Sequence, residues 1–351
     1  MKSKLPDIGK ISPEVFEELI YPRLGAKRTS VLVPPQNGVD VGIVEIGNQA
    51  VAMTADPVFI VPEYGYQRAA WFAIHILASD VVTSGLPPTY LSIDLNLPME
   101  MNESQLETMW QVMHEECKKL GIAVVCGHTA RYENCHFPMV GGATVLAVGA
   151  KEAYVTPKMA KAGDKIIITK GPAIESSGIF ATLFPEKIED RFGKSFAEKA
   201  QNIFYKMSVV EDAMTAVSVG VRENGVTAMH DATECGIWGG VYELAQAAGL
   251  GVRLNKDDIV IEHGIFEICE LFGISDPYAA ISEGTLIIAC RPHKSKAVVE
   301  ALQSKGISAS VVGELTNPKQ GMIVVSQGKE KSFQHPRIDP FWNAFYRTLK
   351  D

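Results

Sequence analysis

Apolar and polar residues alternate or recur at helical spacing along most of the chain, and these patterns predict its first elements. Residues 41–46 and 50–54 have the composition of two strands joined by a three-residue loop with glycine, which predicts a β-hairpin. Residues 68–88 form an Ala- and Ile-rich run, which predicts a helix that ends at Gly85 before two prolines. Residues 90–98 alternate apolar with polar side chains, which predicts an antiparallel strand with one wetted face.

The same patterns continue to the end of the chain. Asn102 and Gln105 form a capping box for an amphipathic helix that Gly121 ends. The further predicted strands are 122–126, a strand pair within 139–150, 165–169, 226–229, 284–290, 307–313 and 321–325. Two further helices are predicted to end at Leu183 and at Gly249. Other predicted helices cover 195–206, 208–220, 262–272 and 294–305, and a short helix is predicted in the tail.

Length and composition indicate a globular protein of two domains. The chain has 351 residues, which is long for a single core, and its apolar and charged contents of 46% and 21% are ordinary. The polar, turn-rich segment 155–164 is the expected boundary. We therefore expect an N-terminal arm at 1–36, domains at 37–155 and 156–325, and a tail at 326–351.

Charge and hydropathy set expectations for partners and location. The net charge is −8 and no basic stripe is present, so no nucleic-acid partner is expected. No apolar run approaches about 18 residues and the N-terminus lacks a signal-peptide core, so we expect no membrane partner and a cytoplasmic location. The six cysteines are scattered through apolar stretches, which favours reduced thiols over a disulfide framework.

One acidic residue is out of place in the helix at 68–88. Asp80 lies in an apolar run near the helix C-terminus, where burial and the partial negative charge of the helix end both disfavour a carboxylate. Either Asp80 faces water or a cation compensates its charge.

The predicted hairpin brings two more acids together. Asp40 begins its first strand and Asp56 follows its second, so both carboxylates reach the same open end. Like charges placed side by side are destabilising unless a cation joins them. Two solvated loop acids are the alternative interpretation.

Residues 126–136 contain two cysteines and two histidines. Their spacing, with Cys126, His128, Cys135 and His136 as the four candidates, fits no common zinc module. A loop after a strand is nonetheless a usual position for ligand-binding residues.

Two strand-to-helix turns in the second half carry further candidate chemistry. Ser176 or Ser177 can cap a helix after Gly171-Pro172, and free N–H groups at a helix start suit phosphate, although most such turns only begin helices. The turn after 226–229 contains His230 and Asp231 and is more polar than helix capping requires, although Asp231 or Thr233 could simply be the N-cap.

The order of these motifs resembles the PurM superfamily of ATP-binding enzymes. It includes aminoimidazole-ribonucleotide synthase, thiamine-monophosphate kinase, selenophosphate synthetase and the hydrogenase-maturation protein HypE. The matching segments, which span about residues 35–325 in the family's order, are SDVVTSGLPPTYLSIDL, CGHTA, GDKIIITKGPAIESSGI, MHDATECGIWGGVYELA and SEGTLIIA. HypE and HypE-like proteins related to aminoimidazole-ribonucleotide (AIR) synthase are the most similar branch.

The resemblance implies a two-domain α+β fold that binds ATP and Mg²⁺. It implies an N-terminal mixed or antiparallel sheet domain that pairs into an intersubunit barrel in a homodimer, and a C-terminal α/β sandwich domain. By position, Asp80 matches the aspartate that binds magnesium at the ATP phosphates. Asp56 matches another metal-binding position, and Asp40 matches the Gly-Asp-Asp-Ala segment of the thiamine-phosphate kinases.

The resemblance also implies roles in the second domain and in the CGHTA segment. The second domain, with Ser176-Ser177-Gly178 and His230-Asp231, is expected to close over the phosphates and the substrate. We interpret His230 and Asp231 as candidates for substrate orientation or proton transfer. Gly127-His128-Thr129 stands where most relatives have Gly-Asp-Thr or Gly-Glu-Thr, so His128 is a candidate ligand or phosphate contact and the number of magnesium ions stays open.

Two departures bear on the reaction. HypE ends in the cysteine that it modifies, whereas this chain ends Leu349-Lys350-Asp351, so dehydration of its own tail is not expected. Residues 1–36 contain no cysteine to match the reactive residue of selenophosphate synthetase. The expected function is activation of an amide- or carbonyl-type oxygen of an unknown small-molecule or protein acceptor. The alternatives are a kinase like thiamine-monophosphate kinase and a non-catalytic nucleotide-binding maturation partner.

Overall fold

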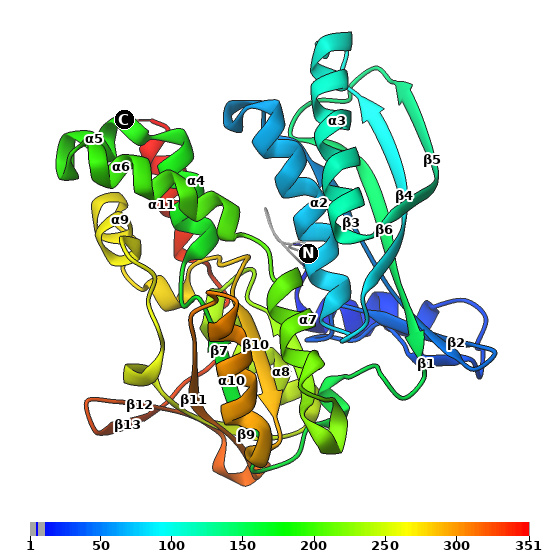
Figure 1. Ribbon diagram of the computed structural model, residues 1–351, viewed down its shortest axis with the longest axis vertical. Coiled ribbons are helices and arrows are strands. Elements are labelled where there is room, and N and C mark those ends of the chain that lie inside the picture. Colours follow the sequence, from blue (N-terminus) through cyan, green and yellow to red (C-terminus); the bar gives the residue numbers. More distant parts are fainter. Residues whose placement is uncertain (1–4, 6–10, 351) are drawn as a thin grey trace.

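Two β-sheets organise the computed structural model, which describes Leu5 and residues 11–350 (Figure 1). Residues 1–4, 6–10 and 351 lie outside this description, so the predicted N-terminal arm is described only in part. One sheet has six strands in the order β1-β2-β3-β6-β4-β5, and the other has seven in the order β13-β12-β9-β11-β7-β10-β8. The predicted α+β architecture of two sheets is confirmed.

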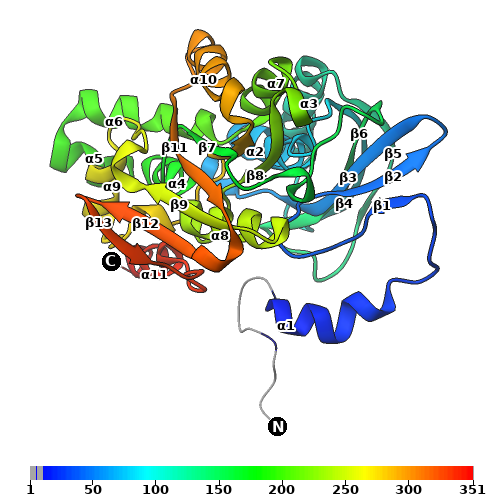
Figure 2. The ribbon, with the colours of Figure 1, turned by 90° about the horizontal axis from the view of Figure 1, so that it is seen from below.

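The first sheet is built from strands in the N-terminal half, with helices α2 and α3 against one face (Figure 1). Its strands are β1 (Val31–Val33), β2 (Gly42–Ile46), β3 (Gln49–Phe59), β4 (Pro88–Leu97), β5 (Ala123–Arg131) and β6 (Met139–Ala150). The helices of this half are α1 (Pro13–Val15), α2 (Tyr66–Val82) and α3 (Glu103–Leu120). Figure 2 shows the segment around α1 standing away from the sheets.

The predicted hairpin and helix form as expected. Strands β2 and β3 pair antiparallel, with Ile46 opposite Gln49. The capping box at Asn102 and Gln105 begins α3, as predicted. Helix α2 ends because Thr83 donates its hydroxyl to the carbonyl of Asp80 at 2.7 Å and the chain then turns into β4.

Three predictions in this half were wrong in detail. Strand β4 pairs antiparallel with β6 but parallel with β5, because the chain returns through α3 on one face of the sheet. Strand β5 runs on through Arg131, so the segment expected to be a loop continues the sheet. Residues 139–150 form the single strand β6, which reaches across β3 and β4 instead of folding back on itself.

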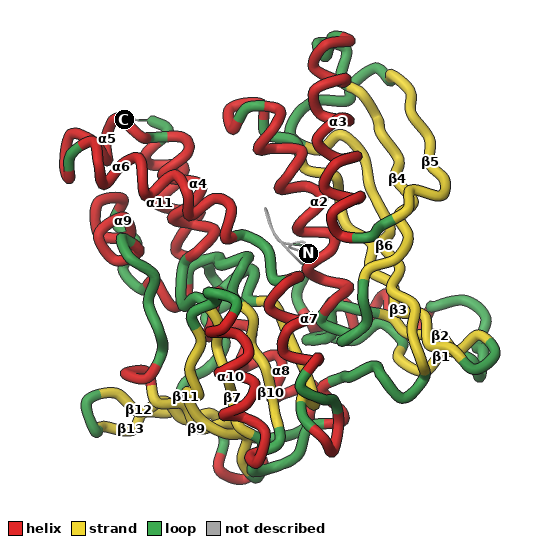
Figure 3. The backbone as a smooth tube through the Cα atoms, viewed as in Figure 1, coloured by secondary structure: helices red, strands yellow, loops and turns green. Residues whose placement is uncertain are grey.

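The second sheet lies between helices on both faces (Figure 3). Its strands are β7 (Lys165–Thr169), β8 (Val226–Asp231), β9 (Gly251–Asn255), β10 (Leu286–Cys290), β11 (Ala309–Thr316), β12 (Met322–Ser326) and β13 (Lys329–Ser332). The helices of this half are α4 (Ile174–Leu183), α5 (Pro185–Phe192), α6 (Lys194–Gln201), α7 (Val210–Ser218), α8 (Gly236–Ala248), α9 (Ile265–Phe272), α10 (Ser295–Ser304) and α11 (Pro340–Thr348). The sequence patterns missed α5, β9 and β13, which are short.

Burial on both faces explains the apolar composition of the central strands. In β7, Ile167 packs into the core that also contains residues of the first sheet, whereas Ile166 and Ile168 pack into a second core around α8. The tail helix α11 is anchored by Phe341, whose ring lies 5.4 Å from that of Phe180. None of the helices in the described residues is long and apolar enough to cross a membrane.

Candidate active site

Asp56 and Asp80 meet where the second strand of the hairpin passes the C-terminal turn of α2. Thr54 in β3 lies between them, with its hydroxyl 3.0 Å from Asp80 Oδ2 and 3.4 Å from Asp56 Oδ2. The sequence predicted that the strand would end at Asp56. Instead, β3 continues to Phe59 beside β6. The hairpin and α2 therefore deliver two of the three predicted carboxylates to one place.

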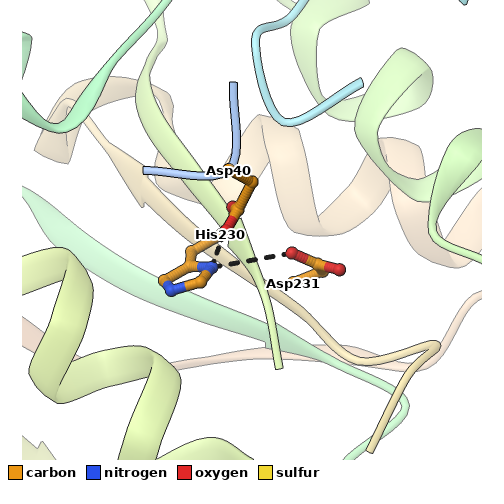
Figure 4. A group of neighbouring side chains, drawn as sticks. All are labelled: Asp40, His230 and Asp231. Atoms are coloured by element: carbon orange, nitrogen blue, oxygen red, sulfur yellow. Dashed lines mark ion pairs between the residues drawn. The ribbon is translucent and has the colours of Figure 1, made fainter. Parts of the chain in front are cut away.

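Asp40, the third predicted acid, connects the first sheet with the second. It lies just before β2, and its Oδ2 is 2.9 Å from Nδ1 of His230, which is near the end of β8 (Figure 4). The same ring nitrogen is 3.6 Å from Oδ1 of Asp231. His230 and Asp231, predicted from a different turn of the chain, thus lie beside the hairpin acids.

The end of β8 is buried and paired with the neighbouring strand β10. His230 and Asp231 pair with Ile287 and Leu286 of β10, and their side chains are only 5% and 1% exposed. Neither Asp231 nor Thr233 caps the following helix, so that alternative was wrong: α8 begins after Cys235.

The start of α8 is held by the tail of the chain. The N–H of Cys235 donates to Asp339 Oδ2 at 2.7 Å. No side chain of the described residues caps α8 itself, and the tail contributes this polar contact beside its first turn.

The carboxylates are close enough to raise one another's pKa. Burial raises the pKa of Asp80 well above its ordinary value, and the charge of Asp231, the hydrogen bond and charge of Asp56, and the charge of Asp40 raise it further. Four carboxylates from both halves of the chain therefore act on one point, which is the environment that a bound cation would relieve.

Two glutamates extend the acidic cluster inward. Burial, followed by the charges of Asp231 and Glu175, raises the pKa of Glu283 well above its ordinary range. Burial likewise raises the pKa of Glu175 to about 8, although the N–H of Glu283 donates to its Oε2 at 3.1 Å. Both shifts favour the neutral, protonated form of these two glutamates, which reduces the negative charge that they add to the site.

The surroundings of His230 favour its charged form, unlike those of the buried carboxyl groups. Burial lowers its pKa, but the charge of Asp40 and hydrogen bonds with Asp231, Asp40 and Glu243 outweigh burial and raise the pKa well above its ordinary value. These contacts favour the protonated form of His230, and in that form both ring nitrogens are donors, which leaves the carboxylates as the groups that can bind a metal ion.

The donor atoms suit a hard divalent cation. Among the described residues, the single group of three His, Cys, Asp or Glu side chains placed to share an ion is Asp40, His230 and Asp231, whose ligand atoms lie within 4.8 Å of one another. With Asp56 and Asp80 nearby, the site offers mainly carboxylate oxygens, the donors that Mg²⁺ takes in proteins. The four cysteine and histidine candidates at 126–136 form no such group within the described part of the chain.

The predicted phosphate-binding residues of the second domain lie inside helix α4. Ala173, in the left-handed conformation, precedes the helix, so neither Ser176 nor Ser177 is its cap. Ser176 donates its hydroxyl to the carbonyl of Ile281 at 2.7 Å, and Gly178 packs closely against the backbone of Phe204. All three predicted residues are buried, and their role in phosphate binding stays a prediction.

Gly127, His128 and Thr129 lie on the exposed edge strand β5. His128 is opposite Asp94 of β4, and its Nε2 is 2.9 Å from the hydroxyl of Tyr132. Among the interactions of the described residues, none joins these three residues to Asp40, Asp56 or Asp80. Their role in nucleotide binding also stays a prediction.

Glu243, Glu283 and Thr54 were not predicted from the sequence. Glu243 lies on the mainly apolar helix α8, so it carries the same signal as Asp80, an acid in an apolar run. Glu283 gives a weaker signal, because Ser-Glu-Gly before a strand is a common turn sequence.

The chain has two sheets, with acidic side chains from both halves acting on Asp80. Residues 38–156 match the N-terminal domain of the AIR synthase related proteins, and residues 161–326 match their C-terminal domain. The chain therefore belongs to the AIR synthase related family, and the predicted membership of the PurM superfamily is confirmed.

Individual relatives are identical to this chain at about a quarter of the aligned positions. Carbamoyl dehydratase HypE from Escherichia coli is 26% identical over 272 residues, which cover 75% of each protein. Selenide, water dikinase from Methanococcus maripaludis is 23% identical over 304 residues, which cover 84% of this chain and 88% of that protein.

Solved structures share the fold. A chain of the HypE–HypF complex matches with a TM-score of 0.71 and 18% identity, covering 92% of this chain and 99% of that chain. The kinase AaThiL with AMPPCP and TMP matches with a TM-score of 0.64 and 20% identity, covering 85% and 90%. HypE in complex with ATP matches with a TM-score of 0.62 and 18% identity, covering 95% and 99%.

Proposed function

We propose that this chain is a Mg²⁺-dependent enzyme that binds ATP and uses it to phosphorylate, and so activate, an amide- or carbonyl-type oxygen. The observation that carries the proposal is the contact of Thr54 with both Asp56 and Asp80, together with the charges of Asp231 and Asp40 that act on Asp80. The ATP in a HypE structure and the AMPPCP in AaThiL support the choice of nucleotide.

Asp40, Asp56 and Asp80 would hold the magnesium. Bound there, Mg²⁺ would neutralise charge on the phosphate oxygens, which is the main requirement of phosphoryl transfer. The single hydroxyl hydrogen of Thr54 is shared between two of these carboxylates, with the shorter contact to Asp80 and the longer one to Asp56. His230 and Asp231 would orient the acceptor or move its proton, because they are the buried polar pair on the second-domain side of the cluster.

The acceptor is proposed by analogy with the relatives. The name carbamoyl dehydratase given to HypE of Escherichia coli supports an amide-type oxygen as the acceptor. The HypE–HypF complex supports a protein as a partner. A non-catalytic nucleotide-binding partner would keep the same ATP site without turnover.

A small-molecule kinase is the second candidate. AaThiL with AMPPCP and TMP shares the fold over 85% of this chain, and the segment with Asp40 is the part of the sequence that resembles that branch. Such an enzyme would transfer the γ-phosphoryl group to a phosphate ester instead of an amide.

A homodimer through the first sheet is part of the proposal. Strand β5 forms the sheet edge, and nearly all of its residues are exposed, including Val124 and Val125. Met139 at the start of β6 and Tyr90 in β4 add exposed apolar surface to the same sheet. Large exposed apolar patches mark interaction surfaces, which supports pairing of two such sheets into a barrel.

Incubation with ATP and Mg²⁺ followed by mass spectrometry tests the proposal. ADP formation that requires Mg²⁺ is expected, and thiamine diphosphate formed from added thiamine monophosphate would favour the kinase. ATP binding without ADP formation in the presence of candidate acceptors would instead favour the non-catalytic partner. Failure to bind ATP at all would contradict every version of the proposal.

A further inference from the structure

Glu243 of helix α8 is a carboxylate with both oxygens engaged by histidines. Its Oε2 is 3.0 Å from Nε2 of His230, and its Oε1 is 3.3 Å from Nε2 of His335 in the segment before α11. The ring of His335 also makes an edge contact with Tyr242, with ring centroids 5.8 Å apart. The orientation of this carboxylate is therefore set by two different parts of the chain.

The contact with Glu243 fixes the direction of the His230 ring. Because Nε2 faces Glu243 and Nδ1 faces Asp40 at 2.9 Å, rotation of the ring would break both contacts. Ionised carboxylates only accept hydrogen bonds, so Nε2 of His230 can donate to Oε2 of Glu243, and Nδ1 is thereby placed at ion-pair distance from Oδ2 of Asp40. His230 is 5% exposed, so water cannot replace either partner without opening the site.

The backbone of Glu243 supports the same loop. Gly38, two residues before Asp40, has φ +72°, and a Cβ there would lie 2.6 Å from the carbonyl oxygen of Glu243. The loop with Asp40 thus rests directly on this turn of α8, while the Glu243 side chain holds Asp40 through His230.

We propose that Glu243 is a positioning residue of the candidate active site, orienting His230 so that the Asp40 carboxylate is held in place for the nucleotide-bound cation. This inference rests on the proposed function, because it assigns Glu243 to the same site. Glu243 does not belong to the predicted set of ligands and acts through another side chain. Its 37% exposed side chain forms the outer side of the cluster, so it can be replaced without opening a cavity in the core.

Two substitutions of Glu243 distinguish its hydrogen bond to His230 from the general effect of a negative charge on the surface. Glu243→Leu removes the acceptor, and Glu243→Gln keeps a side chain that can hydrogen-bond to the ring. We expect Glu243→Leu to raise the KM for Mg-ATP by about 10-fold or more, as removal of a residue that orients a ligand does elsewhere. We expect Glu243→Gln to recover most of this loss, with Glu267→Gln, on the exposed side of α9, as the matched control.

Equal losses in Glu243→Leu and Glu243→Gln would overturn the inference, because a hydrogen-bonding amide would then be no better than a hydrocarbon. A KM unchanged by Glu243→Leu in an active enzyme would also overturn it while leaving the proposed function intact. If the wild-type protein does not use ATP, the proposed function fails, and the second readout below still tests the position of His230.

Nitrogen-15 NMR of the histidine rings provides that second readout in the protein without nucleotide. We expect Glu243→Leu to shift both ring nitrogens of His230, Nε2 by losing its partner and Nδ1 by a changed distance to Asp40. We expect Glu243→Gln to leave the Nδ1 shift near its wild-type value, and a His230→Gln variant assigns the signals. An Nδ1 signal that Glu243→Leu leaves unchanged would overturn the positioning role.

Discussion

Individual carboxylates in this protein are held in surroundings that disfavour their charge. Asp80 combines burial, a helix C-terminus and three neighbouring acids, and each of these disfavours ionisation. Carboxyl groups with strongly perturbed pKa values are concentrated at functional sites. Substitution of Asp80 should therefore change the protein both with and without a bound ligand.

Asp80→Asn replaces an ionisable carboxyl group by a neutral amide of the same volume. We expect the melting temperature of the free protein to stay the same or rise, because repulsion with Asp56, Asp40 and Asp231 is relieved. The increase in melting temperature caused by Mg-ATP is expected to disappear. Thermal unfolding with and without Mg-ATP measures both effects.

Asp94→Asn is the matched control for that substitution, because Asp94 is exposed on β4 and accepts a hydrogen bond from Asn96. We expect it to leave the Mg-ATP effect unchanged. A Mg-ATP effect that survives in Asp80→Asn would count against a metal role for this residue.

Glu175 predicts how stability depends on pH. Burial raises its pKa from 4.5 to about 8, so the folded protein favours the neutral form. Protonated Glu175 therefore contributes to the free energy of unfolding. This contribution is complete below pH 4.5, the ordinary pKa, and is lost as the pH rises through about 8. Melting temperatures measured from pH 5 to 9 in EDTA should therefore fall more steeply in the wild-type protein than in Glu175→Gln, which cannot ionise.

Glu186→Gln, on the exposed start of α5, is the control and should follow the wild-type curve. Parallel curves for the wild type and Glu175→Gln would show that Glu175 ionises normally in the folded protein.

The site residues that sequence could identify are those with an unusual local pattern. Asp80 stands out in an apolar helix and Asp40 at the end of a hairpin, and the structure brings both to the cluster. Thr54 could not be identified, because a threonine in a strand has no distinguishing local pattern. Its role depends on a contact with Asp80, 26 residues away in the sequence.

At the scale of elements, the loop before β2 and helix α8 form the junction between the two halves of the site. Gly38 allows the loop to touch the carbonyl of Glu243, and Asp40 then reaches His230. This junction therefore depends on the absence of a side chain at Gly38.

Gly38→Ala and Gly47→Ala distinguish close approach from backbone strain. Both glycines have positive φ, +72° and +62°, so both substitutions incur a backbone cost of about 1–2 kcal/mol. A Cβ meets no atom within 4 Å at Gly47 but meets the Glu243 carbonyl at Gly38. Urea unfolding should show Gly38→Ala to be less stable by a further 1–3 kcal/mol or so, the usual effect of overpacking.

Gly38→Ala should also weaken Mg-ATP binding, because it displaces the loop that carries Asp40, whereas Gly47→Ala should not. Equal stabilities of the two variants would show that the loop does not rest on α8 in solution.

Elements with strong local periodicity were predictable, and those set by long-range contacts were not. The Ala-rich pattern gives α2 and the alternating pattern gives β4. Sequence could not show that residues 127–131 continue β5, because their pairing partner is β4, about 34 residues earlier. Nor could it show that Ser176 lies inside α4, because the left-handed Ala173 that begins this helix is not a typical residue for that conformation.

At the scale of the whole molecule, the exposed face of the first sheet requires a partner in the proposed homodimer. Val125→Asp places a charge on β5, where Val125 is 57% exposed. We expect it to weaken dimerisation by at least about tenfold, because an unpaired charge is costly to bury in an interface. Light scattering over a range of concentrations measures the change.

Ile338→Asp, on an exposed tail residue, is the control and should leave the dimer intact. A wild-type protein that is monomeric at micromolar concentration would contradict the proposed homodimer.

The two halves of the molecule contribute different parts of one site. Asp56 and Asp80 come from the first sheet and its helix, whereas His230 and Asp231 come from the edge strand of the second sheet. The resemblance of the motifs to the PurM superfamily predicted both domains and their order, but the pairing of Asp40 with His230 depends on how the sheets face each other.

Calorimetric titration of the wild-type protein with ATP, with and without Mg²⁺, tests the central claim most directly. If the converging carboxylates form a nucleotide-bound magnesium site, ATP should bind with Mg²⁺ and bind much more weakly in EDTA. Absence of binding at millimolar ATP with Mg²⁺, or an affinity that Mg²⁺ does not change, would contradict the claim.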